Sequence, residues 1–436
     1  MSTRFAIRGQ TLAFKADPFE VAPEDAIAFD SDGGVVIADG VIEATGPAHA
    51  ILARYPGITV TAYPGHLIMA GFVDCHVHYP QTGIIASYGT QLLEWLDKYT
   101  FPEELKFADP LYAGVVAETF LDEILRNGTT TASVYCTSHP QSVYMLFEAA
   151  QARGLRIAAG KSMMDRNAPA GLLDTPERAC EESEALIRRW HGRDRMTYVV
   201  TPRFAVTSTD RQMAAMGALW QAHPTTLMQT HISENTAEIE RVRQLFPTAR
   251  DYLDTYERVG LIGPGANFGH AIHLDPREID RLRETGSGIS HCPTSNLFIG
   301  SGLFYLAALR QIAKPIPVGL GTDVGGGSSF SMLATMRAAY EIAQLRGNSL
   351  HPVRAFWLAT RGSARVLRMD HAIGNLAPGY EADIAVIDLN STPVITQRMA
   401  RANSISEMLF VQMILADDRA IAATYAAGRL VHCRAG

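Results

Sequence analysis

The chain has 436 residues, of which 47% are hydrophobic and 19% are charged, a composition that allows a large buried core. Its formal net charge is -7 and its 38 Lys and Arg residues form no basic block, which argues against binding to nucleic acid. No apolar run is long enough to span a membrane, so a membrane partner is not expected either. These properties predict a globular protein whose partner is a small molecule.

The cysteines and the first residues both indicate a reducing compartment. The cysteines are widely spaced and form no C-x-x-C pair, so neither a disulfide framework nor a thiolate metal site is expected. The same absence excludes the deaminases that hold zinc through a P-C-x-x-C motif. Residues 1–6 lack the apolar region of a secretory signal. We therefore expect a cytoplasmic protein.

Both ends of the chain have strand-like patterns. β-branched or alternating runs, separated by Gly, Pro and Asp, are typical of short strands with tight turns. Such runs occur at residues 5–8, 34–43, 58–62, 382–388, 408–411 and 420–431. We predict that residues 1–66 and 376–436 together form one small composite β-sandwich domain.

Between these ends, residues 67–375 alternate short apolar runs with longer amphipathic stretches. The apolar runs lie near residues 67–75, 129–135, 155–160, 197–201, 226–231, 265–270, 287–291 and 316–322. The amphipathic stretches include residues 110–126, 175–190, 210–222 and 328–344. This alternation predicts a parallel sheet with outer helices, and eight strands fit an α/β fold of the closed (β/α)8 TIM-barrel type.

No nucleotide-binding motif accompanies the predicted strands. No G-x-G-x-x-G follows the first strand, and the chain has no Walker motif. Glycines 325–327 are a weak candidate for a phosphate loop, and we interpret them as a flexible turn after the last strand. A nucleotide cofactor is therefore not expected.

Candidate metal ligands occur where the predicted strands end, and a barrel assembles its active site at that face. His76 and His78 end the first strand, and their spacing places both imidazoles on one side of it. His231 ends the fifth strand, and Glu234 follows it at the turn into the next helix. Taken singly, the histidine pair could be structural, and the Glu could simply stabilise a helix N-terminus.

The sixth and eighth predicted strands end in the same way, with His270 and Asp323. A lone Asp at such a place is usually an N-cap, but agreement among independently predicted strands favours a metal site. Nitrogen and carboxylate donors without a thiolate fit zinc best, with iron as the alternative. His273 and His291 lie near the same region and are candidates for supporting roles.

These motifs resemble those of the amidohydrolase superfamily. The motif at residues 71–78, Gly-Phe-Val-Asp-x-His-x-His, is joined by His231, His270 and the Gly-Thr-Asp of residues 321–323. Residues 40–46 and 376–383 resemble the β-sandwich segments that flank its barrels. The resemblance implies that one zinc ion per chain is bound by His76, His78, His231 and Asp323. It also implies that Glu234 and Asp323 move protons and that His270 steadies the reaction intermediate.

Within the superfamily the chain resembles the guanine deaminases most. The similar segments are residues 79–81, 92–96, 99–103, 201–204, 231–234 and 291–296, although Cys75 stands where that family usually has Thr. The resemblance implies a homodimer that hydrolyses guanine to xanthine and ammonia. It implies purine binding by Gln81, Arg203, Phe204, Trp95, His231 and Glu234. For Phe204 and Trp95, simple core packing is an equally good interpretation. Arg203 could instead anchor a neighbouring loop through a salt bridge.

Two other functions remain open from the sequence. The chain could be another aminohydrolase of the group, acting on a thioadenosine or adenosylhomocysteine-type substrate, cytosine or a chlorotriazine; the segment 92–96 favours guanine. It could also be a non-catalytic barrel that serves as a scaffold. Such relatives lose metal ligands, whereas every expected ligand is present in this sequence.

Overall fold

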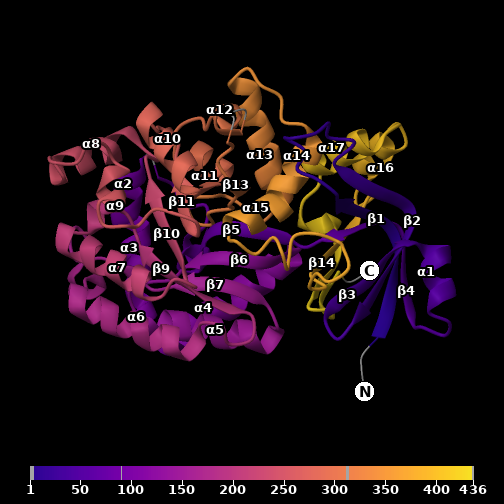
Figure 1. The fold of residues 1–436 in the computed structure, drawn as a ribbon, viewed down its shortest axis with the longest axis horizontal. Coiled ribbons are helices and arrows are strands. Elements are labelled where there is room, and N and C mark those ends of the chain that lie inside the picture. Colours follow the sequence, from indigo (N-terminus) through magenta and orange to yellow (C-terminus); the bar gives the residue numbers. More distant parts are fainter. Residues whose placement is uncertain (1–3, 90, 311–313, 435–436) are drawn as a thin grey trace.

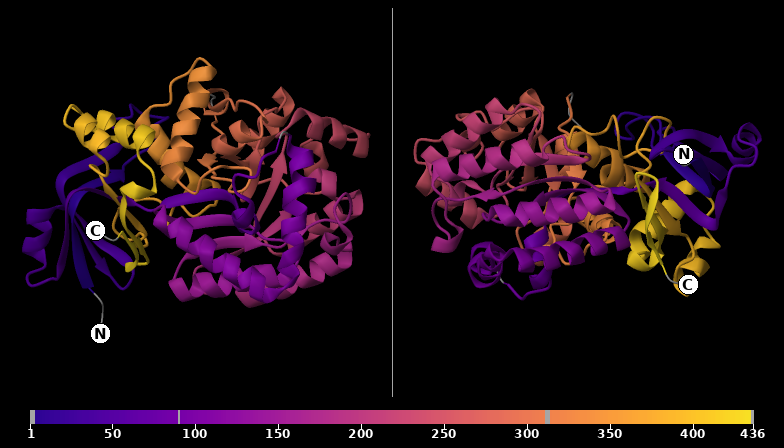
Figure 2. Two further views of the ribbon diagram at one scale, coloured as in Figure 1. Left: turned by 180° about the vertical axis from the view of Figure 1, so that it is seen from behind. Right: turned by 90° about the horizontal axis from the view of Figure 1, so that it is seen from below.

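The computed structural model describes residues 4–89, 91–310 and 314–434. Residues 1–3, which belong to the 1–6 stretch that lacks the pattern of a secretory signal, lie outside this range. A barrel surrounded by helices fills one side of the molecule, and a sheet built from both chain termini lies beside it (Figure 1). The two described chain ends lie on this second sheet's side of the molecule (Figure 2).

The barrel is a nearly closed parallel sheet, as predicted. Its strands, in spatial order, are β5 (Phe72–His78), β6 (Thr129–Tyr135), β7 (Arg156–Gly160), β9 (Met196–Pro202), β10 (Leu227–Ile232), β11 (Ala266–His270), β12 (Gly288–His291) and β13 (Val318–Leu320), with β8 (Ser162–Met163) paired to β9. The edge strands β13 and β5 meet where the Cys75 Sγ donates to the Leu320 carbonyl at 3.0 Å, and just beyond β13 the Asp323 N–H donates to the His76 carbonyl at 2.9 Å.

Helices cover the outside of the barrel. The longer ones are α4 (Pro110–Arg126), α5 (Pro140–Arg153), α6 (Pro176–Trp190), α7 (Asp210–Ala222), α8 (Thr236–Leu245), α10 (Pro276–Thr285) and α13 (Met332–Leu345). Their starts follow the local sequence, because the Asp109, Thr175 and Thr209 side chains each accept a backbone N–H of the first turn. The amphipathic stretches at 110–126 and 210–222 therefore coincide with α4 and α7.

Shorter helices lie between these elements. They are α2 (Leu92–Trp95), α3 (Phe101–Glu104), α9 (Asp254–Glu257), α11 (Pro293–Phe298), α12 (Leu306–Arg310), α14 (Pro352–Trp357) and α15 (Ser363–Val366). Among the described residues, no helix is long and apolar enough to cross a membrane.

The terminal segments form one seven-stranded mixed sheet. Its order is β16 (Arg429–Cys433), β15 (Ile421–Ala426), β14 (Ile384–Asp388), β4 (Val60–Ala70), β1 (Arg4–Phe14), β2 (Ile27–Ala38) and β3 (Val41–Pro47), with helices α1 (Ala48–Arg54), α16 (Pro393–Met399) and α17 (Ile405–Leu415) nearby. Because the central pair β14–β4 joins the two chain ends, neither end completes this sheet alone. The domain boundaries at residues 66 and 375 stay a prediction.

Two strand predictions were wrong. The apolar run 67–75 is shared between two sheets: β4 ends at Ala70, and the barrel strand begins at Phe72. Gly71 separates them where the Thr130 side chain leaves no room for a Cβ. The run 408–411 is helical and belongs to α17, which the Ser404 hydroxyl caps. A continuous apolar run that packs on several sides has no periodicity by which to distinguish helix from strand.

Candidate active site

The main candidate site is a pocket at the C-terminal ends of the barrel strands. It encloses about 390 Å³ including its open mouth. Its walls are formed by His78, Gln81, Leu92, Trp95, Leu96, Arg203, Phe204, His231, Glu234, His270, Ile299, Asp323 and Gly326. The structure thus brings the predicted metal-binding, proton-transfer and purine-binding residues to one cavity, with His76 directly beneath them.

Three imidazoles meet at the base of this pocket. One ring nitrogen from each of His76, His78 and His231 lies within 4.8 Å of the others, and all three residues are buried. His231 Nδ1 lies 2.7 Å from the Arg203 carbonyl, to which it donates, so the lone pair of His231 is on Nε2. His231 Nε2 in turn lies 3.1 Å from His78 Nε2. The arrangement directs nitrogen lone pairs toward one point.

Asp323 completes this group with a carboxylate. Its Oδ1 lies 3.4 Å from the Nε2 atoms of both His76 and His78. Burial raises the pKa of Asp323, but the neighbouring histidines outweigh it and hold the pKa at about 2. Burial keeps the pKa of each of the three histidines below its usual value. A charged carboxylate therefore faces neutral imidazoles, the protonation states that bind a metal ion.

These residues fit a divalent metal ion by a second criterion. Both ring nitrogens of His76 are buried and accept or donate no hydrogen bond to any described residue. Buried polar atoms normally find a partner, and an unmade hydrogen bond costs about 1–3 kcal/mol. A cation shared by the histidines and Asp323 would satisfy His76 Nε2 and separate the facing nitrogens of His78 and His231.

Glu234 and His270 lie beside this group. His270 Nε2 is 3.4 Å from Glu234 Oε2 and 3.7 Å from Asp323 Oδ2. Asn296 Oδ1 accepts from His270 Nδ1 at 3.0 Å, and the Ser301 hydroxyl donates to Glu234 Oε1 at 3.0 Å, so the His270 ring and the Glu234 carboxylate are both oriented. Burial raises the pKa of Glu234 to about 7. A carboxyl group with such a pKa can both accept and release a proton near neutral pH.

The backbone at these strand ends is strained. Ser233, His270, Ala271 and Asp323 all have positive φ, between 48° and 66°. Non-glycine residues adopt this region at an energetic cost, and such residues cluster at functional sites. Glu234 directly follows Ser233 after β10, and His270 at the end of β11 and Asp323 beyond β13 themselves line the pocket. The strain thus coincides with the residues that the sequence assigned to chemistry.

Arg203 forms a buried salt bridge with Glu104, as in the alternative interpretation of this residue, although the sequence did not identify the partner. Its Nη1 bonds both carboxylate oxygens of Glu104, at 2.6 and 2.8 Å, and the two side chains are 2% and 1% exposed. Burial raises the pKa of Glu104 while Arg203 opposes that shift. The Nε and Nη2 atoms of Arg203 make no hydrogen bond to a described residue. They are therefore available as donors to a ligand, while the charge of Arg203 is balanced by Glu104.

The remaining purine-binding candidates also line the pocket. Gln81 packs against Gly325, whose φ of +112° and contact with Gln81 leave no room for a side chain. The glycine turn is therefore buried and forms part of the wall, rather than a free loop. Phe204 packs edge-on against His231, with ring centroids 6.3 Å apart. Trp95 is buried, and its Nε1 bonds no described residue.

The two supporting histidines do not reach the pocket. His273 Nε2 lies 2.8 Å from the Ser301 carbonyl and therefore supports the residue that holds Glu234. His291 stacks on Phe304 at 4.3 Å, and burial lowers its pKa to about 3. Among the described residues, no hydrogen bond or ion pair joins the His291 side chain to a residue that lines the pocket.

Three other residues at the site were missed from the sequence. Asp74 accepts the N–H of both His76 and Thr322, at 3.2 and 3.1 Å, and so ties the first ligand strand to the turn that carries Asp323. Cys292 places its sulfur within 4.8 Å of ligand atoms of His76 and Asp323, but burial raises the pKa of its thiol well above the usual value. Ser301 lies in an irregular loop with no motif that could have identified it.

Comparison with known proteins agrees with this site. The profile of the Amidohydrolase family matches residues 67–431. Guanine deaminase of Escherichia coli K12 is 47% identical over 96% of this chain and 94% of its own, and guanine deaminase of Mus musculus is 35% identical over 83% and 82%.

Solved structures give the same result. E. coli guanine deaminase superposes with a TM-score of 0.96 at 46% identity, covering 99% of this chain and 100% of its own. A guanine deaminase from C. acetobutylicum with guanine bound in its active site gives 0.88 at 26% identity, with the same coverage. A zinc-bound adenosine deaminase from Xanthomonas campestris, 21% identical with a TM-score of 0.84 over 98% and 92%, shares the fold alone. The chain belongs to the amidohydrolase family.

Proposed function

We propose that this protein hydrolyses guanine to xanthine and ammonia. The observation that carries the proposal is the composition of one pocket: orphaned buried imidazoles and two carboxylates share it with Arg203 and Gln81. The similarity to guanine deaminases over nearly the whole chain supports the same substrate. A scaffold role is disfavoured, because a scaffold has no use for unpaired buried nitrogens.

We assign the metal ion to His76, His78, His231 and Asp323. A bound zinc ion would lower the pKa of water toward 7 and so supply a nucleophile at neutral pH. Glu234 takes one proton from the attacking water and delivers it to N3 of the purine ring. The second proton of the water, from the hydroxyl group of the adduct, is then passed to the amine, which leaves as ammonia. His270, held by Asn296, donates toward the oxygen of the tetrahedral adduct at C2. Asp323 shares the proton transfer through its second oxygen.

The purine is held by polar donors and flat apolar surfaces. The free Nε and Nη2 atoms of Arg203 and the amide of Gln81 match the O6 acceptor of guanine. Phe204 and Trp95 pack along the ring. Adenine presents an amine at the same position and would leave a buried donor unpaired. Sites of this kind reject such analogues by as much as about 10⁴-fold.

The finer features follow from the same assignment. We propose one zinc ion per chain, with Fe²⁺ as the alternative, because nitrogen and carboxylate donors suit both metals. We also propose a cytoplasmic homodimer, as the resemblance to guanine deaminases and the unpaired cysteines imply. No nucleic-acid partner is expected, given the net charge of -7 and the dispersed basic residues. Metal analysis after dialysis against a chelator and reloading distinguishes zinc from iron by the activity each restores.

The direct test is ammonia release from a panel of guanine, adenine, cytosine and melamine, with xanthine identified as the product from guanine. We expect guanine to be turned over and adenine to be rejected by orders of magnitude. Equal rates on guanine and adenine would contradict the assigned substrate. Turnover of melamine or cytosine alone would instead favour another aminohydrolase of the family.

A further inference from the structure

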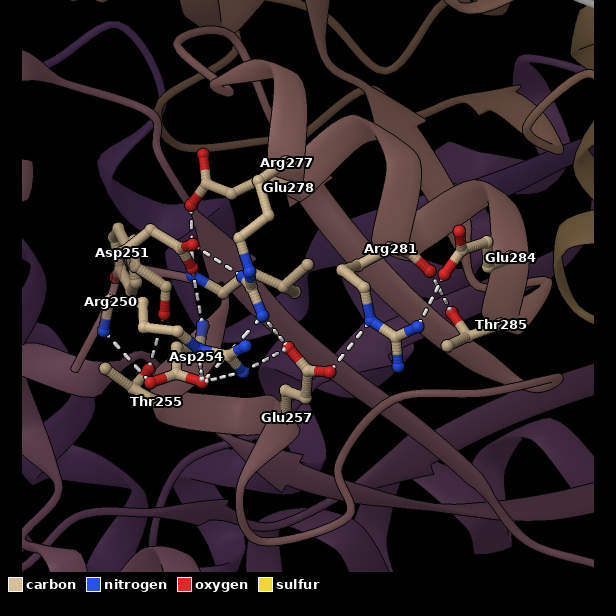
Figure 3. Close-up of polar contacts among 12 residues, drawn as sticks. Arg250, Asp251, Asp254, Thr255, Glu257, Arg277, Glu278, Arg281, Glu284 and Thr285 are labelled. Atoms are coloured by element: carbon tan, nitrogen blue, oxygen red, sulfur yellow. Dashed lines mark hydrogen bonds and ion pairs between the residues drawn. The ribbon is translucent and has the colours of Figure 1, made fainter.

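The segment 250–257, which includes α9, lies between α8 and β11 and packs against α10. On its outer side, its carboxylates face arginines of the segment itself and of α10 (Figure 3). Glu257 pairs with Arg277 and with Arg281, the latter at 2.8 Å, and the Arg250 Nε bonds Asp254 at 2.9 Å. The Leu253 N–H donates to Glu278 at 3.0 Å. These contacts hold the segment firmly to α10.

On its inner side the same segment bonds the strand that carries a metal ligand. The Tyr256 hydroxyl donates to the His231 carbonyl at 2.9 Å. It also accepts the Ala205 N–H at 3.0 Å and the Thr230 hydroxyl at 3.1 Å. Tyr256 is fully buried, so this hydroxyl is a fixed junction between the ends of β9 and β10. It bonds the backbone of His231 itself and that of Ala205 in the segment after β9.

A second tyrosine reaches the proton-transfer residue indirectly. The Tyr252 hydroxyl donates to Glu238 Oε1 at 2.6 Å. Glu238 Oε2 accepts the N–H groups of Glu234 and Asn235, at 2.9 and 3.1 Å. Glu238 is fully buried, and its capping box starts α8 directly after Glu234. The Tyr252 hydroxyl therefore fixes the carboxylate that fixes the backbone of Glu234.

We propose that Tyr252 and Tyr256 are positioning residues, each of which orients a different part of the site. Tyr256 holds the His231 end of the metal site, and Tyr252, through Glu238, holds Glu234 for proton transfer. Neither tyrosine lines the pocket, and both are anchored to α10 through the same short segment. The assignment of Tyr252 rests on the proposed function of Glu234. The assignment of Tyr256 requires only that His231 binds metal.

The first experiment measures zinc release from loaded protein into excess chelator. We expect Tyr256→Phe to lose zinc about 10–100-fold faster than wild type, the scale typical of removing a supporting hydrogen bond from a metal ligand. Tyr252→Phe should release zinc at the wild-type rate. Tyr380→Phe is the matched control, because its hydroxyl donates to the Asp370 carbonyl at 2.9 Å, in the terminal-sheet region. Release from Tyr256→Phe at the control rate would overturn its assignment.

The second experiment separates kcat from KM on guanine with zinc in excess. Tyr252→Phe should lower kcat about 10-fold or more and leave KM within about twofold, because Glu234 acts on protons and not on binding. Glu238→Gln should show the same pattern, and the double variant should lose little more than Glu238→Gln alone. Full additivity, or a loss confined to KM, would overturn the assignment of Tyr252.

Failure of the proposed function and failure of the tyrosine assignments give different results. A wild-type protein that binds zinc but leaves guanine unchanged would contradict the proposed function, while the zinc-release experiment would still decide the role of Tyr256. If Tyr→Phe variants lose only thermal stability, with wild-type zinc release and kcat, both tyrosines are structural and the proposal is wrong.

Discussion

Buried polar groups at the two ends of the barrel differ in whether they have partners within the protein. At the C-terminal end, His76 nitrogens are buried without a partner and the backbone of Asp323 is strained. At the N-terminal end, where β7 and β9 begin, Arg156 and Arg195 both bond Glu381, through Nε atoms at 2.9 and 3.1 Å. Arg195 also donates to the Gly154 carbonyl at 2.6 Å. The C-terminal end leaves buried polar atoms without a protein partner, available to a ligand, whereas the polar groups named at the N-terminal end pair with one another.

This difference indicates where stability and function reside. In a (β/α)8 barrel the C-terminal face supports chemistry and the opposite face supports stability. Glu381 precedes β14 of the terminal sheet, so its pairs with the barrel arginines join the two parts of the molecule. Substitutions at the two ends should therefore separate loss of activity from loss of folding, and four variants test that separation.

The largest effect is expected at His231. We expect His231→Ala to bind well below one zinc per chain and to lose deamination, because it removes a central nitrogen ligand. Metal analysis and ammonia release measure both. His371→Ala, at an exposed position, is the control and should match wild type. Full metal with a near-normal rate in His231→Ala would exclude it as a ligand.

Glu234 should show the next largest effect and a different pattern. Glu234→Gln keeps a polar side chain of the same size but cannot carry the proton, so we expect a loss of about 10²–10⁴ in kcat. Bound zinc should stay at the wild-type level. Loss of metal in this variant would place Glu234 among the ligands and remove its assigned role.

Arg203 tests a buried charge pair at the catalytic end of the barrel. Arg203→Ala leaves the Glu104 carboxylate buried without its partner, so we expect a loss of about 3–5 kcal/mol of stability as well as of guanine turnover. The double variant Arg203→Met with Glu104→Gln removes both charges and should recover most of the stability. Chemical denaturation and guanine kinetics measure the two effects. Recovered turnover in the double variant would show that Arg203 serves only as the partner of Glu104.

The smallest effect is expected at the opposite end. Burial raises the pKa of Glu381, but Arg156 and Arg195 outweigh it and the net shift is downward. A carboxylate with a lowered folded-state pKa stabilises above its unfolded pKa, about 4.3. That contribution is lost as pH falls through the folded-state value. Glu381→Gln should therefore cost about 1–3 kcal/mol at neutral pH and keep wild-type kcat.

The difference in the free energy of unfolding between Glu381→Gln and wild type should become smaller in acid than at neutral pH. Urea unfolding at an acidic and at a neutral pH measures this difference. Glu240→Gln is a suitable control. Both side chains of the Glu240–Arg243 pair are exposed, so the pair contributes little to the free energy of unfolding. A pH-independent difference would show that Glu381 acts through packing and not through charge.

Local sequence patterns were sufficient to predict the ends of strands and the starts of helices that depend on residues of the same segment. The end of β10 just after His231 and the end of β11 at His270 follow from short apolar runs that stop near polar residues. The start of α4 follows from the Asp109 cap and the proline after it. Because parallel strands of a barrel end on one face, these local assignments were enough to place the metal-binding and proton-transfer candidates together.

Contacts between distant segments were decided only by the tertiary structure. Glu104 and Arg203 are 99 residues apart, and their pairing depends on how α3 folds over the barrel mouth. The Tyr256 hydroxyl reaches His231 only because α10 holds the 250–257 segment in place. The 408–411 run became a helix because its apolar side chains are buried on several sides, which no period in the sequence records. The sequence by itself thus determined the strand ends and their ligands, whereas packing between remote segments decided how those ligands are held.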